Sequence, residues 1–156
     1  VPRLIEPDGF SLDVGSGDEL QLRRFHDQET LGGTDTTFRW SRDRSFVSML
    51  GVSPDRSVLT LWLSNGGRPA TSEPATVEVV LLPQVGAACC TLGTVTVADR
   101  FEPYVFDIPP ILAARVAMTR TRALLELRVS TWNPGEALGI NDPRELGVMV
   151  DRIMVE

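Results

Sequence analysis

Six side chains of this sequence are of the types that bind a sugar ring. Tryptophan offers a flat apolar surface to the C–H face of such a ring, while arginine and carboxylate side chains form paired hydrogen bonds with its hydroxyls. All six are expected at or near strand ends, where loops present side chains to a ligand. They are Glu29, Arg39, Trp40, Trp132, Asp142 and Arg144. The sequence therefore predicts a candidate carbohydrate site built from these residues.

The same residues also have a purely structural interpretation. Trp40 and Trp132 would fill the ends of a hydrophobic core, and the two arginines would pair with Glu29 and Asp142 to hold loops together. The two interpretations differ in the cost of Trp132→Ala. A buried indole predicts a loss of about 3–5 kcal/mol of stability, whereas an exposed one predicts little change. The sequence leaves both interpretations open.

Catalytic chemistry has weaker support in the sequence. Glycoside hydrolysis needs two carboxylates about 5–10 Å apart, and Glu29 with Asp142 or Glu145 is one conceivable pair. His26 could serve as a base beside Glu29, but we expect it at the surface near a turn. The chain has no Gly-x-Ser-x-Gly elbow, phosphate loop or dinucleotide fingerprint. We therefore expect no catalytic residues, and a glycoside-active enzyme ranks third among the functions considered.

The composition narrows the remaining choices. A length of 156 residues fits one domain, residues 1–156. The net charge of −6 argues against a nucleic-acid partner, and all fifteen basic residues are arginine, which excludes a lysine Schiff base. The most apolar window, residues 76–98, contains Glu78, Pro83 and Gln84, so it cannot span a bilayer. Because the chain begins with Val1, we interpret it as a piece of a longer protein.

The only two cysteines, Cys89 and Cys90, are neighbours. Extended backbone points neighbouring side chains to opposite faces, and bridging them requires a strained ring. We therefore expect two thiols, one buried and one near the surface. A single histidine in the chain leaves too few ligands for a zinc site, so no metal or cofactor is predicted from these residues.

Short runs of β-forming residues must position the six candidates. Asn65-Gly66-Gly67 supplies the positive φ of a tight turn, Ser41 to Arg44 reads as a polar turn, and residues 111–118 could form at most one or two irregular helical turns. Ten short strands at this spacing predict an all-β fold, a jelly-roll β-sandwich. The expected strands are residues 11–14, 20–25, 36–40, 46–50, 58–63, 76–82, 92–98, 103–108, 124–129 and 147–155.

Several short motifs, in this order and spacing, resemble a group of bacterial domains. They are Asp13-Val14-Gly15, Gly17-Asp18, Phe25-His26-Asp27-Gln28-Glu29, Phe38-Arg39-Trp40-Ser41, Trp132-Asn133-Pro134 and Asp142-Pro143-Arg144-Glu145-Leu146-Gly147-Val148. The chain is similar to extracytoplasmic, galactose-binding-like jelly rolls, related to carbohydrate-binding modules, in membrane proteins of which many are glycosyltransferase-like. The group carries a glycine where this chain has Arg24, so the local turn is expected to differ.

This resemblance implies a location and a set of partners. It places the domain outside the cytoplasm, attached to a membrane through a segment outside this sequence. A non-catalytic module that binds a glycan is the favoured function. The alternative is a structural domain that packs on its parent membrane domain or on a second copy. Jelly rolls of this kind often carry a structural calcium, for which Asp13, Asp18 and Asp151 are candidate ligands.

Overall fold

The computed structural model describes residues 10–15, 17–18, 21–83, 90–119 and 122–156, which form ten strands and two helices. The elements in chain order are β1 (Phe10–Asp13), β2 (Leu22–Phe25), β3 (Glu29–Thr30), β4 (Thr37–Met49), β5 (Val58–Ser64), β6 (Thr76–Leu82), β7 (Thr91–Thr96), β8 (Glu102–Asp107), α1 (Pro110–Thr119), β9 (Ala123–Val129), α2 (Pro134–Leu138) and β10 (Met149–Val155). Within the described residues, no helix is long and apolar enough to cross a membrane.

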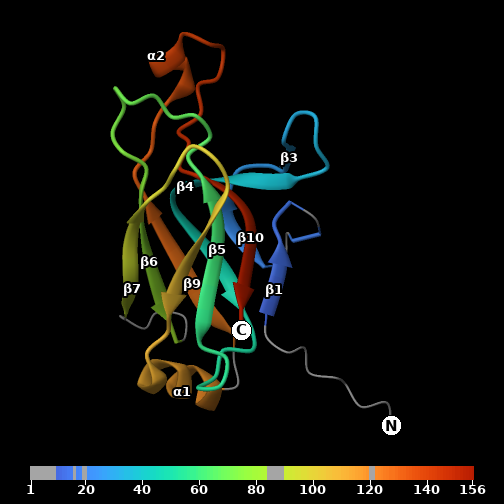
Figure 1. Cartoon of the computed structure of the whole chain (residues 1–156), viewed down its shortest axis with the longest axis vertical. Helices are drawn as coiled ribbons and strands as arrows, with labels where there is room; N and C mark the ends of the chain where they lie inside the picture. The colour runs from blue at the N-terminus through green and yellow to red at the C-terminus, as the bar shows by residue number, and fades with distance from the viewer. Residues whose placement is uncertain (1–9, 16, 19–20, 84–89, 120–121) are drawn as a thin grey trace.

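The strands form the two layers of a sandwich, with antiparallel pairing throughout (Figure 1). One layer has the order β8–β5–β10, and both β1 and the first part of β4 pair with the free edge of β10. The other layer has the order β7–β6–β9–β4–β2. Strand β4 belongs to both layers and joins them along one side. The predicted class, an all-β jelly-roll-like sandwich, is confirmed.

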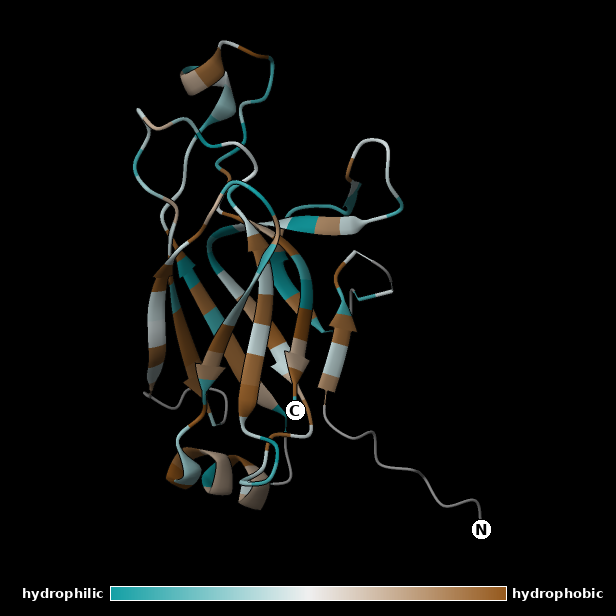
Figure 2. Ribbon diagram, in the orientation of Figure 1, coloured by the Kyte–Doolittle hydropathy of each residue, from teal (hydrophilic) through white to brown (hydrophobic). Residues whose placement is uncertain are grey.

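Apolar side chains from both layers fill the space between them. Leu61 of β5, Leu81 of β6 and Ile153 of β10 are completely buried. In β9, Leu125 and Leu127 point inward as the alternating pattern predicts. Figure 2 shows hydrophobic residues concentrated on the strands and hydrophilic ones in the connecting loops. The ordinary two-residue period of strands therefore builds most of this core.

Strand β4 differs from the prediction of two strands separated by a polar turn. It runs for 13 residues without interruption, and its pairing partner changes from β10 to β9 along its length. The polar residues can lie within a continuous strand because their backbone and hydroxyl groups form hydrogen bonds there. Ser41 bonds to Gly147 and Val148 through its backbone, and the Ser45 hydroxyl donates to Arg24 O and accepts from Arg42 N. The predicted turn is in fact the bend that carries one strand between the layers.

The other expected strands lie within two residues of their predicted ends, whereas β3 was not predicted. Helix α1 is longer and more regular than expected, at 10 residues. It buries Leu112, Ala113 and Val116 against the end of the sandwich, and this packing stabilises a helix whose sequence alone has little amphipathic character.

Cys90 is in a disulfide, which corrects the expected thiol. It lies just before β7 and exchanges backbone hydrogen bonds with Leu81 of β6, whereas Cys89 lies outside the described residues.

Arg24 occupies a backbone conformation that favours glycine. Its φ is +61°, and the register between β2 and β4 shifts at this position. A side chain in this region costs about 1–2 kcal/mol, more for a β-branched residue. Glycine would adopt this conformation without the steric cost that a Cβ brings.

We expect Arg24→Gly to leave stability within about 1 kcal/mol of the wild type, because relief of strain offsets the loss of an exposed ion pair with Asp43. Arg24→Val should lower stability by about 1–2 kcal/mol more than Arg24→Gly does. Urea denaturation of the two variants measures the difference. Equal stabilities of the two variants would contradict a positive φ at position 24.

Candidate functional site

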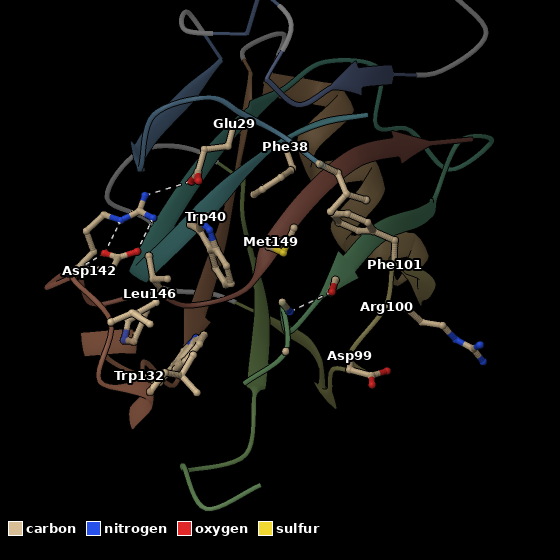
Figure 3. A pocket seen from close by; sticks show the side chains of 18 residues that line it. Glu29, Phe38, Trp40, Asp99, Arg100, Phe101, Trp132, Asp142, Leu146 and Met149 are labelled. Atoms are coloured by element: carbon tan, nitrogen blue, oxygen red, sulfur yellow. Dashed lines mark hydrogen bonds and ion pairs between the residues drawn. The ribbon is translucent and has the colours of Figure 1, made fainter. Parts of the chain in front are cut away.

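A pocket of about 670 Å³ opens at the end of the sandwich opposite α1 (Figures 1 and 3). Its walls come from β3, the start of β4, the loops after β5 and β7, and the segment between β9 and β10. The aromatic side chains of the pocket form a second apolar cluster, which is separate from the main core between the layers. The pocket is therefore a feature of the loop end, built on rigid strand ends.

The structure brings five of the six predicted site residues to this pocket. They are Glu29, Trp40, Trp132, Asp142 and Arg144. The sixth, Arg39, follows the alternation of β4 and lies on the opposite face from Trp40. It forms an ion pair with the fully buried Asp18 at 3.0 Å and donates to the carbonyl of His26. The expected pairing of Arg39 with Glu29 or Asp142 is wrong, because adjacent residues of one strand cannot point to the same side.

Aromatic rings and two aliphatic side chains form the floor of the pocket. Trp40 packs against Trp132 with ring centroids 6.2 Å apart at 63°, and Phe38 packs against Trp40 at 6.4 Å and 81°. These are edge-to-face contacts, which aromatic quadrupoles favour. Leu146 and Met149 complete the cluster, with Phe101 packed against it. Trp40 and Trp132 are only 7% and 6% exposed, so protein covers most of both indoles.

Backbone hydrogen bonds hold Trp132 in place. Its N–H donates to the carbonyl of Leu146 at 2.9 Å, and Leu146 N donates back to Trp132 O at 2.8 Å. This bridge ties the strand end after β9 to the segment before β10. The indole Nε1 of Trp132 is buried and has no acceptor among the described residues. Such a donor is costly to leave unpaired, so a ligand oxygen that reached it would gain a hydrogen bond.

Arg144 forms the charged wall of the pocket together with two carboxylates. Its Nε and Nη2 donate to the two oxygens of Asp142 at 2.9 and 2.8 Å, and its Nη1 donates to Glu29 at 3.1 Å (Figure 3). Glu29 and Arg144 are 115 positions apart in the chain, so this pair ties β3 to the segment before β10. These are the ion pairs that the structural interpretation expects of Arg144.

This wall makes stability depend on pH. Hydrogen bonds from the Arg144 side chain hold the pKa of Asp142 below its ordinary value of 3.8, although partial burial acts in the opposite direction. A lowered pKa means that the folded state favours the carboxylate. Its contribution is therefore complete above pH 3.8 and is lost as the pH falls below that value.

We accordingly expect Asp142→Asn to be less stable than the wild type at neutral pH, with a difference that shrinks as the pH falls below 3.8 and the wild-type carboxylate becomes protonated as well. Urea denaturation at several pH values measures this difference. Asp27→Asn, at an exposed position, serves as the control and should match the wild type throughout. A pH-independent deficit in Asp142→Asn would contradict a charge-based contribution.

Gly66 allows the loop after β5 to approach the pocket floor. Its φ is +67°, as the Asn65-Gly66-Gly67 turn predicts. A Cβ at this position would overlap the indole of Trp40 and lie 2.8 Å from the sulfur of Met149. Glycine is therefore required here both for its backbone conformation and for the contact with the floor.

We expect Gly66→Ala to lower stability by about 2–4 kcal/mol, because steric overlap adds to the conformational cost. Gly67→Ala is the matched control, since Gly67 also has a positive φ of +84° but open space where its Cβ would lie. It should lose only about 1 kcal/mol. Thermal unfolding of both variants measures the two losses. Equal losses would show that the Trp40 indole does not lie against Gly66.

The short helix α2 was missed by the sequence analysis although its capping signals are present. Asn133 accepts a hydrogen bond from Glu136 N at the amino end, Pro134 occupies the first turn, and Gly139 ends the helix with a φ of +66°. The helix brings Leu138 and Ile140 to the pocket mouth, where they are 50% and 52% exposed. Leu31, after β3, is 37% exposed at the same mouth.

The residues considered for catalysis are held by structural contacts. His26 is buried rather than at the surface, because its Nε2 lies 2.9 Å from the carbonyl oxygen of Glu145. Glu29 and Asp142 both bind Arg144, and Glu145 accepts from the side-chain amide of Asn133. These four side chains thus tie together the loops at this end of the sandwich.

The carboxylates considered for calcium do not gather into one site. Asp18 accepts from Arg39 and from the backbone N–H of Gly15. Asp13 and Asp151 lie close enough to interact, since burial first and the charge of Asp13 second raise the pKa of Asp151. Among the described residues, no three histidine, cysteine, aspartate or glutamate side chains are grouped as metal ligands would be.

Comparisons with known proteins find a likeness in structure and none in sequence. No protein-family model matches the chain, and no curated protein matches it in sequence. A solved structure, the K1 cleaved adhesin domain of Lys-gingipain from Porphyromonas gingivalis W83, aligns over 97% of this chain and 92% of that one. The TM-score is 0.44 and the sequence identity 11%. At this level the likeness carries no conclusion about ligand or activity.

Proposed function

We propose that this domain is a non-catalytic binding module whose pocket at the loop end takes a carbohydrate. One observation carries the proposal: five side chains of sugar-binding types, from segments far apart in the sequence, line a single pocket. Its volume of about 670 Å³ falls within the range of small-molecule sites. The proposal also assigns the domain to the outside of the cytoplasm, within a larger membrane-anchored protein, on the basis of the family resemblance.

The chemistry of the walls suits a ring that is apolar on one side and rich in hydroxyls on the other. The C–H groups would contact the pocket-facing edges of the tryptophans and of Phe101. Hydroxyls would donate to Glu29, whose Oε2 accepts from Arg144 while no described residue binds its Oε1. Because the indoles are mostly covered, the ring would contact edges rather than stack on a broad open face.

Tryptophan fluorescence tests the proposal directly. The chain has three tryptophans, and Trp62→Phe leaves only the two in the pocket as reporters. Titration of this variant with neutral and charged monosaccharides and disaccharides to millimolar concentration should give a saturable change in emission. Absence of binding to every sugar, by fluorescence and by calorimetry, would overturn the proposal.

A matched pair of variants locates the binding. Glu29→Gln should weaken sugar binding about tenfold, the effect of one charge-assisted hydrogen bond. Glu78→Gln is the control, because Glu78 also pairs with an arginine, at 3.1 Å, and has similar exposure, but lies outside the pocket. Equal weakening in both would show that binding occurs elsewhere.

A second candidate function is suggested by the pocket mouth. Leu31, Leu138 and Ile140 are large apolar side chains exposed around one opening, as at surfaces that contact another protein. The domain would then pack on its parent protein or on a second copy without a small ligand. Light scattering across a concentration series detects self-association, and Leu138→Ser with Ile140→Ser should abolish it without altering the fold.

A further inference from the structure

The negative charges around this pocket are more available to a ligand than the positive charges are. Glu29, Asp99 and Asp142 supply three carboxylates, whereas Arg100 and Arg144 supply two guanidinium groups. Nitrogens Nε, Nη1 and Nη2 of Arg144 all donate to carboxylates already. Its charge is therefore neutralised before any ligand arrives.

Arg100 is directed away from the pocket floor (Figure 3). Its side chain is 82% exposed, and its Nε pairs with Glu102 at 3.1 Å, a residue that does not line the pocket. An anionic ligand would need a cation that faces it, and neither arginine of the described pocket lining provides one, because Arg144 is fully paired and Arg100 points away.

Carboxylate oxygens, in contrast, remain open. Glu29 is 36% exposed and uses one oxygen for Arg144, and Asp99 is exposed with no partner among the described residues. In Figure 3 these two carboxylates lie on opposite sides of the aromatic floor. A positive charge between them would be attracted from both sides, although exposure to solvent keeps each attraction modest.

The overall charge of the protein favours the same sign of ligand charge. The net charge of −6 on the chain adds a weak long-range attraction for cations. Trp40, Trp132 and Phe101 line the pocket and offer apolar contact for the ring of such a ligand. The open carboxylates of the pocket and the overall charge thus favour a cationic ligand.

We propose that the ligand of this pocket carries a positive charge next to an apolar ring, as an amino sugar does. This inference rests on the proposed function for the sugar and adds the class of sugar. An amine would donate to Glu29 or to Asp99 while the ring contacts the aromatic floor. A uronic acid would bring its carboxylate against these same groups, and repulsion would weaken its binding.

Four probes separate the two proposals, all titrated into the Trp62→Phe variant and followed by fluorescence and by NMR of the indole N–H signals. Glucosamine has the ring and the charge, N-acetylglucosamine the ring alone, glucuronate the opposite charge, and choline the charge without a sugar. We expect glucosamine to bind about tenfold more tightly than N-acetylglucosamine, with glucuronate weakest. The advantage should shrink at about 1 M salt, where exposed charges are screened.

Charge-neutralising variants identify the groups responsible. Glu29→Gln and Asp99→Asn should each reduce the preference for glucosamine over N-acetylglucosamine by about threefold or more. Asp107→Asn is the control, since it removes the same charge from the opposite end of β8 and should leave the preference unchanged. Loss of the preference in all three would assign it to overall charge and overturn the assignment to this pocket.

The outcomes distinguish the two proposals. Equal binding of glucosamine and N-acetylglucosamine, or tighter binding of glucuronate, overturns the inference and leaves the carbohydrate site standing. Binding of choline without any sugar overturns the proposed function and supports the cationic class. Binding of none of the four overturns both.

Discussion

We expect the replacement of Trp132 with alanine to lower the free energy of unfolding by about 3–5 kcal/mol, the range for truncating a buried aromatic side chain. Trp132 is 6% exposed, packs edge-to-face on Trp40, and belongs to the strand end that pairs with Leu146. The cavity left by the indole would lie directly beneath the pocket, so the remaining floor cannot close over it easily. The structural interpretation of Trp132 predicts this loss of stability, and the presence of a ligand site above the indole does not change the expected loss.

Urea denaturation measures this loss, and Trp62→Ala is the control for removal of an indole. Trp62 lies in β5 and is only partly buried, so its loss should cost less than that of Trp132. Trp132→Phe should recover part of the stability because it retains a ring in the cluster. A melting temperature unchanged in Trp132→Ala would show that the indole is exposed in solution, and would restore the interpretation of an open stacking surface.

We expect Arg68→Met to produce the second large effect, a loss of about 3 kcal/mol or more in the free energy of unfolding. Arg68 is 8% exposed and donates to the carbonyls of Glu73, Ser130 and Gly147 and to the Ser130 hydroxyl. Among the described residues no carboxylate ion-pairs with it, and burial lowers its pKa, while the charge of Glu73 acts against that shift. Methionine fills similar space but leaves those acceptors without a donor.

The position of Arg68 connects stability to the pocket. Its guanidinium joins the loop that follows Gly67 to Ser130, two residues before Trp132, and to Gly147, two residues before Met149. Arg68→Lys keeps the charge but cannot span the same acceptors, so it should recover only part of the loss. Arg152→Met, at an exposed position in β10, should change stability by less than about 0.5 kcal/mol. Equal effects at both positions would contradict the role of these buried hydrogen bonds.

Local patterns allowed much of the fold to be predicted. Strand β6 matches its predicted bounds, and β9 shows the expected inward face. The turn at Gly66 and Gly67 has the positive φ expected of it. These features depend on the two-residue period of a strand and on the conformational freedom of glycine, both properties of neighbouring residues.

Other features were misread although the local signals were present. The caps of α2 at Asn133 and Gly139 are ordinary helix boundaries, and the alternation of β4 already separated Arg39 from Trp40. Grouping these two side chains into one site ignored that alternation. Tertiary structure was not needed to place Arg39 on the other face, only a consistent use of the strand period.

Strand period and turn chemistry act over a few residues, so the class of fold and the residue types available for a site were predictable from the amino-acid sequence. Which side chains meet depends instead on how distant segments pack. Glu29 reaches Arg144 across 115 positions, and Glu126 of β9 is buried because Arg44 of the neighbouring strand β4 and Arg128 of β9 both pair with it. The burial of Trp132 is likewise a product of packing. Such contacts depend on how separate strands are placed, and no local pattern encodes that distance.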